Sequence, residues 1–252
     1  SKIQFFIEPG NFTGTFTASV KVLYEKLDFA FEMLEEILLR SKLTDEKRLG
    51  EILDETMSRA RMRLENSSHS SAAMRAASYY SPLSSFYDRT GGIGFYQFLE
   101  KITERCSKEE GYRLKLGKKL MEVAKTLFTA SNMTVSYTAD EEGYVRLPAA
   151  LAAFKAVLPE GNGIRYPYEF KPELKNEGFR TASQVNYVAR CGTFGESAYT
   201  GALKVLKVIL NYEYLWVNLR VKGGAYGCMS SFGRNGETML VSYRDPKLGE
   251  TN

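Results

Sequence analysis

The chain has 252 residues, 44% hydrophobic and 25% charged, which is typical of a globular protein and not of a disordered one. Its 34 basic and 30 acidic residues leave a net charge of +4, too small for the basic surface of a nucleic-acid-binding protein. The single histidine, His69, excludes a two-histidine zinc motif, and three widely spaced cysteines without a CxxC pair exclude a cysteine zinc site.

The first 160 residues contain two predicted strands among several predicted helices. Strands are predicted over 13–20 and 132–139, where apolar residues alternate with small or polar ones. Apolar residues at three- and four-residue steps predict amphipathic helices over 22–41 and 44–65. Further helices are expected over 70–80, 90–102, 112–128 and 147–157, with Pro148 in the first turn of the last one and Ser81-Pro82 ending the first.

Residues 159–178, PEGNGIRYPYEFKPELKNEG, have no periodicity and read as a linker. Beyond them we predict a strand over 181–192, helices over 199–211 and 213–220, and a hairpin whose strands flank the turn GRNG. This order lacks a regular alternation of strand and helix. It indicates an α+β fold with two layers, in which helices cover one face of a mostly antiparallel sheet. The last part is short of strands, so we expect a piece of a longer protein.

The segment RVKGGAYG (220–227) has two interpretations on local grounds. In the first it is a helix end, with Arg220 and Lys222 near the negative end of the helix dipole and Gly223 as a left-handed cap. In the second it is a loop whose backbone approaches a ligand while Arg220 and Tyr226 reach for it. It fits neither a dinucleotide-binding motif nor a phosphate loop.

Several segments together resemble the C-terminal half of presequence proteases, members of the pitrilysin/insulysin family of inverted-motif zinc metallopeptidases. They are LYEKLDFAFEMLEEIL, NSSHSSAAMRAASYYSP, RTGGIGFYQFLE, TASQVNYVARCG, the run from Tyr214 to Gly227, and VSYRDP. The resemblance implies four homologous α+β domains in two halves that close around a peptide chamber. It places residues 1–160 in the third domain, 161–178 in a linker and 179–252 in the fourth domain.

The resemblance also implies the chemistry of the site. Zinc and its HxxEH motif belong to the N-terminal half, so this chain binds no metal and is inactive alone. Its share is substrate binding by Arg220 and Tyr226, with Gly223 and Gly224 making the turn that presents them. Tyr226 is the implied catalytic residue, because its hydroxyl stabilises the oxyanion that forms in the transition state. The implied partners are unstructured peptides and the zinc-binding half, with no nucleic acid or membrane.

Two other functions stay open at this stage. The same fold serves as a structural scaffold without peptidase activity, and an HxxEH motif upstream would distinguish the two cases. An anion-binding module built on Arg220 and Lys222 would show salt-dependent affinity. The segment SKIQFFIEPG lacks the features of a signal peptide, no apolar run is long enough to span a membrane, and free thiols suit a reducing compartment. The expected location is cytoplasmic in a bacterium, or the mitochondrial or plastid matrix in a eukaryote.

Overall fold

The computed structural model describes the chain except residues 1, 9–10, 162–167, 183, 196–197 and 252; for residues 2–8 and 11–12 only the backbone is described. The chain forms two compact units, each assembled from two stretches of sequence. Unit 1 comprises Ser1–Ile52 and Arg105–Tyr168, and unit 2 comprises Leu53–Glu104 and Glu169–Asn252. The long helices α2 (Glu46–Asn66) and α5 (Ile93–Lys108) contribute residues to both units.

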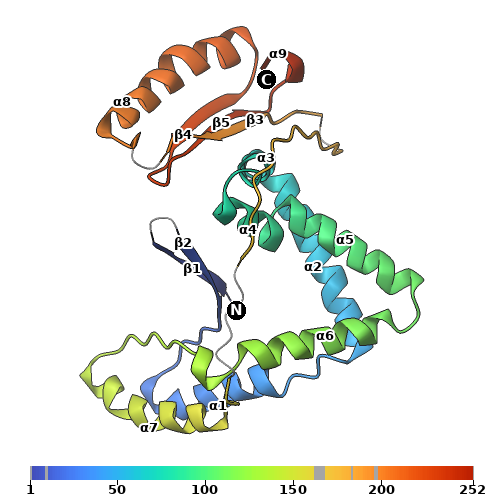
Figure 1. Cartoon of the computed structure of the whole chain (residues 1–252), viewed down its shortest axis with the longest axis vertical. Helices are drawn as coiled ribbons and strands as arrows, with labels where there is room; N and C mark the ends of the chain where they lie inside the picture. The colour runs from blue at the N-terminus through green and yellow to red at the C-terminus, as the bar shows by residue number, and fades with distance from the viewer. Residues whose placement is uncertain (1, 9–10, 162–167, 183, 196–197, 252) are drawn as a thin grey trace. The chain divides into compact units, whose positions relative to one another are not determined.

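Unit 1 consists of a β-hairpin and a group of helices (Figure 1). Its remaining elements are β1 (Lys2–Glu8), β2 (Asn11–Thr17), the 3₁₀ turns η1 (Tyr24–Lys26) and η2 (Ala130–Asn132), and the helices α1 (Leu27–Leu39), α6 (Tyr112–Leu127) and α7 (Glu141–Val157). Strands β1 and β2 pair antiparallel in the register Lys2↔Thr17. Helices α1 and α7 pack together through Phe31 and Phe154, whose ring centres lie 5.3 Å apart.

The strand predicted over 132–139 is wrong. Residues 133–140 have no regular structure, and no described strand pairs with them. Tyr137 instead packs edge-on against Tyr144, and the Tyr144 hydroxyl donates to the Tyr137 carbonyl at 2.9 Å. Helix α7 also begins at Glu141, earlier than expected, because the Asp140 carboxylate accepts a hydrogen bond from the Gly143 N–H at 3.0 Å. Pro148 therefore lies inside the helix, where it removes one backbone hydrogen bond.

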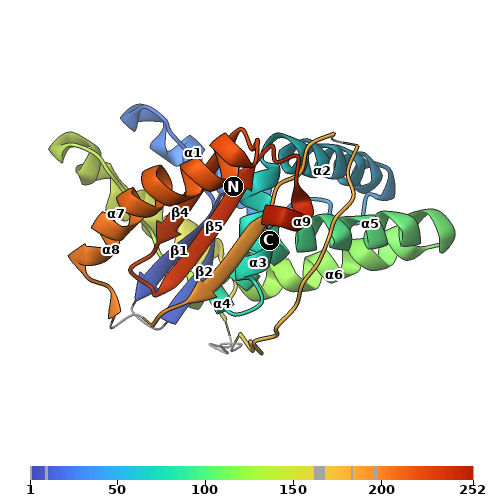
Figure 2. The same cartoon turned by 90° about the horizontal axis from the view of Figure 1, so that it is seen from above.

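Unit 2 contains a three-stranded sheet with helices on both faces (Figures 1 and 2). Its further elements are α3 (Ser68–Ala77), α4 (Pro82–Gly91), β3 (Ala189–Thr193), α8 (Gly201–Ile209), the π-helix η4 (Leu210–Lys222), β4 (Gly227–Phe232), β5 (Glu237–Tyr243) and α9 (Leu248–Thr251). The strand order is β3-β5-β4, and both pairs are antiparallel. Asn211 of η4 accepts hydrogen bonds from the backbone and the hydroxyl of Ser230 on β4. On the opposite face, Tyr243 of β5 packs edge-on against His69 of α3.

These elements confirm the predicted α+β class and the hairpin at GRNG, where Gly236 has a φ of 78°. The predicted helices at 199–211 and 213–220 form one continuous helix, α8 followed by η4. The strand predicted over 181–192 is shorter, although Asn186 forms an isolated bridge with Asp245. Ser81 does end α3, and its hydroxyl also caps the unpredicted helix α4. Residues 168–178 form neither helix nor strand, and residues 162–167 of the predicted linker lie outside the described residues. The homologous-domain division at 160 and 179 stays a prediction.

Candidate functional site

The first candidate is the junction between η4 and β4, where RVKGGAYG lies. Helix η4 ends at Lys222; Gly223 has a right-handed φ of −83°, and Gly224 has a left-handed φ of 84°. The left-handed residue is therefore Gly224, and the expectation that Gly223 is the left-handed cap is wrong. The N–H of Gly224 donates to the Arg220 carbonyl at 3.0 Å, and that of Ala225 to the Leu219 carbonyl at 2.9 Å. Each bond is one residue longer than in a Schellman cap, because a π-helix has a wider turn.

This turn brings Arg220 and Tyr226 together. The Arg220 Nη1 donates to the backbone carbonyl of Tyr226 at 2.5 Å, and its Cζ lies 5.4 Å from the centre of the Tyr226 ring. Trp216, one helical turn before Arg220, lies under the same guanidinium at 4.2 Å. The guanidinium is thus held between two aromatic rings and one carbonyl, which leaves further N–H donors for a ligand.

Tyr226 is fixed through its backbone and exposed through its side chain. Its N–H donates to the carbonyls of Tyr243 at 3.0 Å and Arg244 at 3.4 Å, and the preceding Ala225 is buried. Its side chain is 63% exposed, and the described residues offer its hydroxyl no hydrogen-bond partner. A phenol presented in this way can donate a hydrogen bond to an oxygen of a bound molecule.

The structure adds three residues that the sequence analysis did not assign to the site. Trp216 lies against Arg220, the Tyr243 ring lies 6.1 Å from that of Tyr226, and the Arg244 Cζ lies 6.0 Å from the Tyr226 ring centre. Trp216 could have been found from its position four residues before Arg220 on a helix. Tyr243 and Arg244 come from the next strand, so no local spacing indicates them. Lys222, by contrast, turns toward Asn218, to which its Nζ donates at 3.4 Å.

The charge at this junction is positive and not neutralised. Among the described residues, no carboxylate oxygen lies within 4.0 Å of Arg220 or Arg244. The neighbouring hydroxyls, that of Tyr243 first and that of Tyr187 next, raise the pKa of Arg244, so it stays charged. Partial burial raises the pKa of the Cys228 thiol despite the opposing effect of the Arg220 charge. Cys228 is therefore a poor nucleophile at neutral pH.

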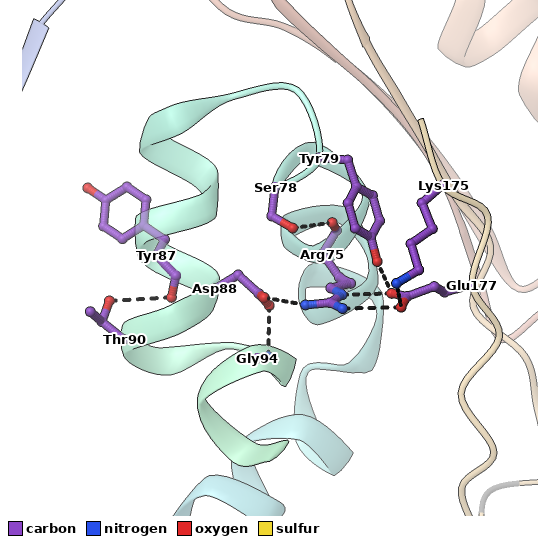
Figure 3. A network of polar contacts seen from close by, with 9 residues as sticks. All are labelled: Arg75, Ser78, Tyr79, Tyr87, Asp88, Thr90, Gly94, Lys175 and Glu177. Atoms are coloured by element: carbon purple, nitrogen blue, oxygen red, sulfur yellow. Dashed lines mark hydrogen bonds and ion pairs between the residues drawn. The ribbon is translucent and has the colours of Figure 1, made fainter. Parts of the chain in front are cut away.

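A second polar cluster, centred on Arg75 of α3, differs because its charges are saturated (Figure 3). The Arg75 Nη1 donates to the Asp88 carboxylate at 2.7 Å, and Nε and Nη2 donate to Glu177 at 2.7 and 3.2 Å. The Tyr79 hydroxyl and Lys175 also contact Glu177. The buried Asp88 further accepts from the Gly94 N–H at 3.1 Å. This cluster holds the irregular segment 168–180 on α3 and α4, and we regard it as structural.

The part of the chain that the structure describes offers no metal centre. No three His, Cys, Asp or Glu side chains are grouped there so that they could hold a metal ion. His69 lies within α3 with its ring against Tyr243 and Tyr187, which differs from the capping or surface position expected for it. None of the described helices has the length and apolar character needed to cross a membrane.

The chain is similar to peptidase families in two separate regions. Residues 4–102 match the family model of the associated region of M16 peptidases, subfamily C, and residues 176–252 match "PreP C-terminal domain". It is 32% identical to "Protein HypA" of Clostridium perfringens, over 92% of this chain and 24% of that protein. It is 27% identical to "Presequence protease 1, chloroplastic/mitochondrial" of Arabidopsis thaliana, over 92% of the chain and 22% of the relative. The mitochondrial presequence protease of Saccharomyces cerevisiae is 25% identical, over 89% of the chain and 24% of the relative. The chain thus spans about a quarter of the length of these curated relatives.

Proposed function

Because this chain belongs to the C-terminal region of the presequence protease family, within subfamily C of the M16 peptidases, we propose that it supplies a substrate-binding part of a zinc-dependent oligopeptidase. In this proposal Arg220 and Tyr226 contact an unstructured peptide, and the zinc-binding half of the same protein cleaves it. The chain alone hydrolyses nothing.

One observation carries this proposal. The turn at Gly223-Gly224 places the Arg220 guanidinium beside Tyr226 and leaves the Tyr226 hydroxyl exposed and without a partner among the described residues. An exposed phenol beside an incompletely bonded guanidinium offers two kinds of donor to the oxygens of a peptide. A site in which both residues were saturated, as Arg75 is, would not support this role.

The two side chains have different tasks in the proposal. Tyr226 donates a hydrogen bond to the oxygen of the scissile carbonyl, whose charge grows in the transition state, so its contribution lowers the barrier. Arg220 holds a neighbouring peptide carbonyl or chain terminus through its remaining N–H groups. Gly224 permits the left-handed turn, and at Gly223 a Cβ would lie 2.6 Å from the Leu219 carbonyl oxygen.

The M16 peptidases are zinc-dependent, and the residues of this chain do not fit a zinc site. With one histidine and no suitable cluster among its described side chains, the chain has no ligand set for that ion. We therefore assign the zinc ligands and the general base to the N-terminal half of the longer protein. The location follows the same reasoning: cytoplasmic in a bacterium, or the mitochondrial or plastid matrix in a eukaryote, as in the names of the relatives.

The test is kinetic and uses the longer, zinc-loaded protein that contains this segment. Tyr226→Phe removes one oxyanion donor, so we expect kcat to fall about 100-fold or more while KM changes little. The matched control is Tyr212→Phe, because Tyr212 is a similarly exposed tyrosine on the same helix that makes no contact with the site. Unchanged kcat in Tyr226→Phe would refute the assigned role. Absence of any peptidase activity in the parent protein would favour the scaffold.

A further inference from the structure

Arg244 has a backbone conformation that arginine rarely adopts. Its φ is 50°, the left-handed region, and among the described residues other than glycine it is the only one with a positive φ. Such a conformation persists only where the surrounding structure determines it, and it is concentrated at functional sites. Arg244 follows the end of β5 directly and lies beside Tyr226.

The bonds on both sides of Arg244 explain how this conformation is kept. On one side, the Tyr226 N–H donates to the Arg244 carbonyl. On the other, Asp245 and Asn186 exchange backbone hydrogen bonds of 2.8 and 3.1 Å, and the Asn186 side chain adds one of 3.0 Å to the Asp245 carbonyl. The Asp245 side chain is almost fully buried and accepts from the Lys247 N–H at 2.8 Å. The turn is therefore rigid, while the Arg244 side chain is exposed.

Arg244 and Arg220 bring two positive charges to one aromatic ring. Their Cζ atoms lie 6.0 and 5.4 Å from the centre of the Tyr226 ring. Arg75 of the same unit binds two carboxylates, whereas the described residues place no carboxylate within 4.0 Å of Arg220 or Arg244. Two exposed guanidiniums without counter-charges match the geometry of a carboxylate, which accepts paired N–H donors.

We propose that Arg244 is a specificity residue of the substrate site and that, together with Arg220, it binds a carboxylate group of the peptide. This inference rests on the proposed function of Arg220 and Tyr226 and adds the class of peptide that the site prefers. The carboxylate belongs to an acidic side chain or to the C-terminus of the peptide, since both present the same chemistry. Peptides that carry such a group near Tyr226 bind more tightly than neutral ones.

The whole chain can report binding directly, because it contains one tryptophan and that residue, Trp216, lies at the site. The assay titrates the chain with three short unstructured peptides of one sequence and follows Trp216 fluorescence. The first has an internal glutamate and an amidated C-terminus, the second has glutamine and a free C-terminus, and the third has glutamine and an amidated C-terminus. Comparing the first two with the third identifies which carboxylate is bound.

We expect at least one carboxylate peptide to bind about tenfold more tightly than the neutral peptide, a difference of about 1.4 kcal/mol. Arg244→Asn should reduce this preference to about twofold or less, since asparagine tolerates the left-handed turn but carries no charge. Arg234→Asn removes another exposed arginine, from the distant hairpin turn, and should leave the preference intact. Circular dichroism checks that both variants are folded.

Other outcomes would overturn the inference in distinguishable ways. Equal affinity for all three peptides, or a preference that survives Arg244→Asn, refutes the role of Arg244 and leaves the roles of Arg220 and Tyr226 untouched. No fluorescence change with any peptide at millimolar concentration refutes a peptide site at this junction altogether. Loss of the preference in Arg244→Asn combined with normal kcat in Tyr226→Phe would instead retain the carboxylate site and remove the oxyanion role.

Discussion

Replacing Arg75 with methionine tests whether the cluster in Figure 3 stabilises unit 2. The Asp88 side chain is 3% exposed, and the change removes its ion pair of 2.7 Å, leaving it the hydrogen bond from the Gly94 N–H. Glu177 is less affected, because it is 19% exposed and keeps its contacts with Tyr79 and Lys175. The cost should therefore come mainly from the stranded Asp88 charge, and such losses are about 3–5 kcal/mol.

The free energy of unfolding is measured by urea titration, followed through Trp216, which lies in unit 2. The matched control is Arg59→Met on α2, whose ion pair with Glu55 is exposed and should contribute less than about 1 kcal/mol. Adding Asp88→Asn to Arg75→Met should recover part of the loss, because it removes the uncompensated charge. If Arg75→Met costs no more than Arg59→Met, or if Asp88→Asn recovers nothing, the reasoning about this buried pair is refuted.

Two further predictions concern the site and a buried thiol. In the longer enzyme, Trp216→Ala should lower kcat/KM about tenfold by freeing the Arg220 guanidinium, and Trp216→Phe should restore most of it; equal defects in both variants would show that stacking is unimportant. Burial first, and the Glu237 charge next, raise the pKa of Cys191 from 9.0 to about 11, so the folded state favours the protonated thiol. The stabilisation is complete below pH 9 and is lost as the pH rises toward 11, by about 1–2 kcal/mol after allowing for partial exposure. Cys191→Ala should flatten the pH dependence of urea unfolding in this range and Cys106→Ala should not; a slope that persists in Cys191→Ala would contradict the assignment.

The Arg75 cluster also explains a glycine motif that the sequence alone left as a helix lead-in. In TGGIG, a Cβ at Gly92 would lie 2.6 Å from the Asp88 Oδ1, and a Cβ at Gly94 would lie 2.4 Å from Oδ2. Side chains at these positions would displace the carboxylate from Arg75. The glycines are required by a buried charge beside them and not by a phosphate.

Local patterns were sufficient for much of the fold. Three- and four-residue apolar steps predicted α1 and α2, and Asn-Gly predicted the hairpin between β4 and β5. These features depend on residues a few positions apart, whose interactions are decided by the period of the backbone. The same approach failed at 132–139, because alternating residues form a strand only where another strand supplies hydrogen bonds.

The spacing of Arg220 and Tyr226, with the glycines between them, was available from the sequence through its resemblance to a peptidase family. The tertiary structure decided which glycine turns the chain, because the π-helix extends the turn by one residue before Gly224. It also decided that Arg244 joins the site and that Glu177 reaches Arg75 across 102 positions. Sequence periodicity carries no information about such contacts, since they exist only after the strands have paired and the helices have packed on the sheet.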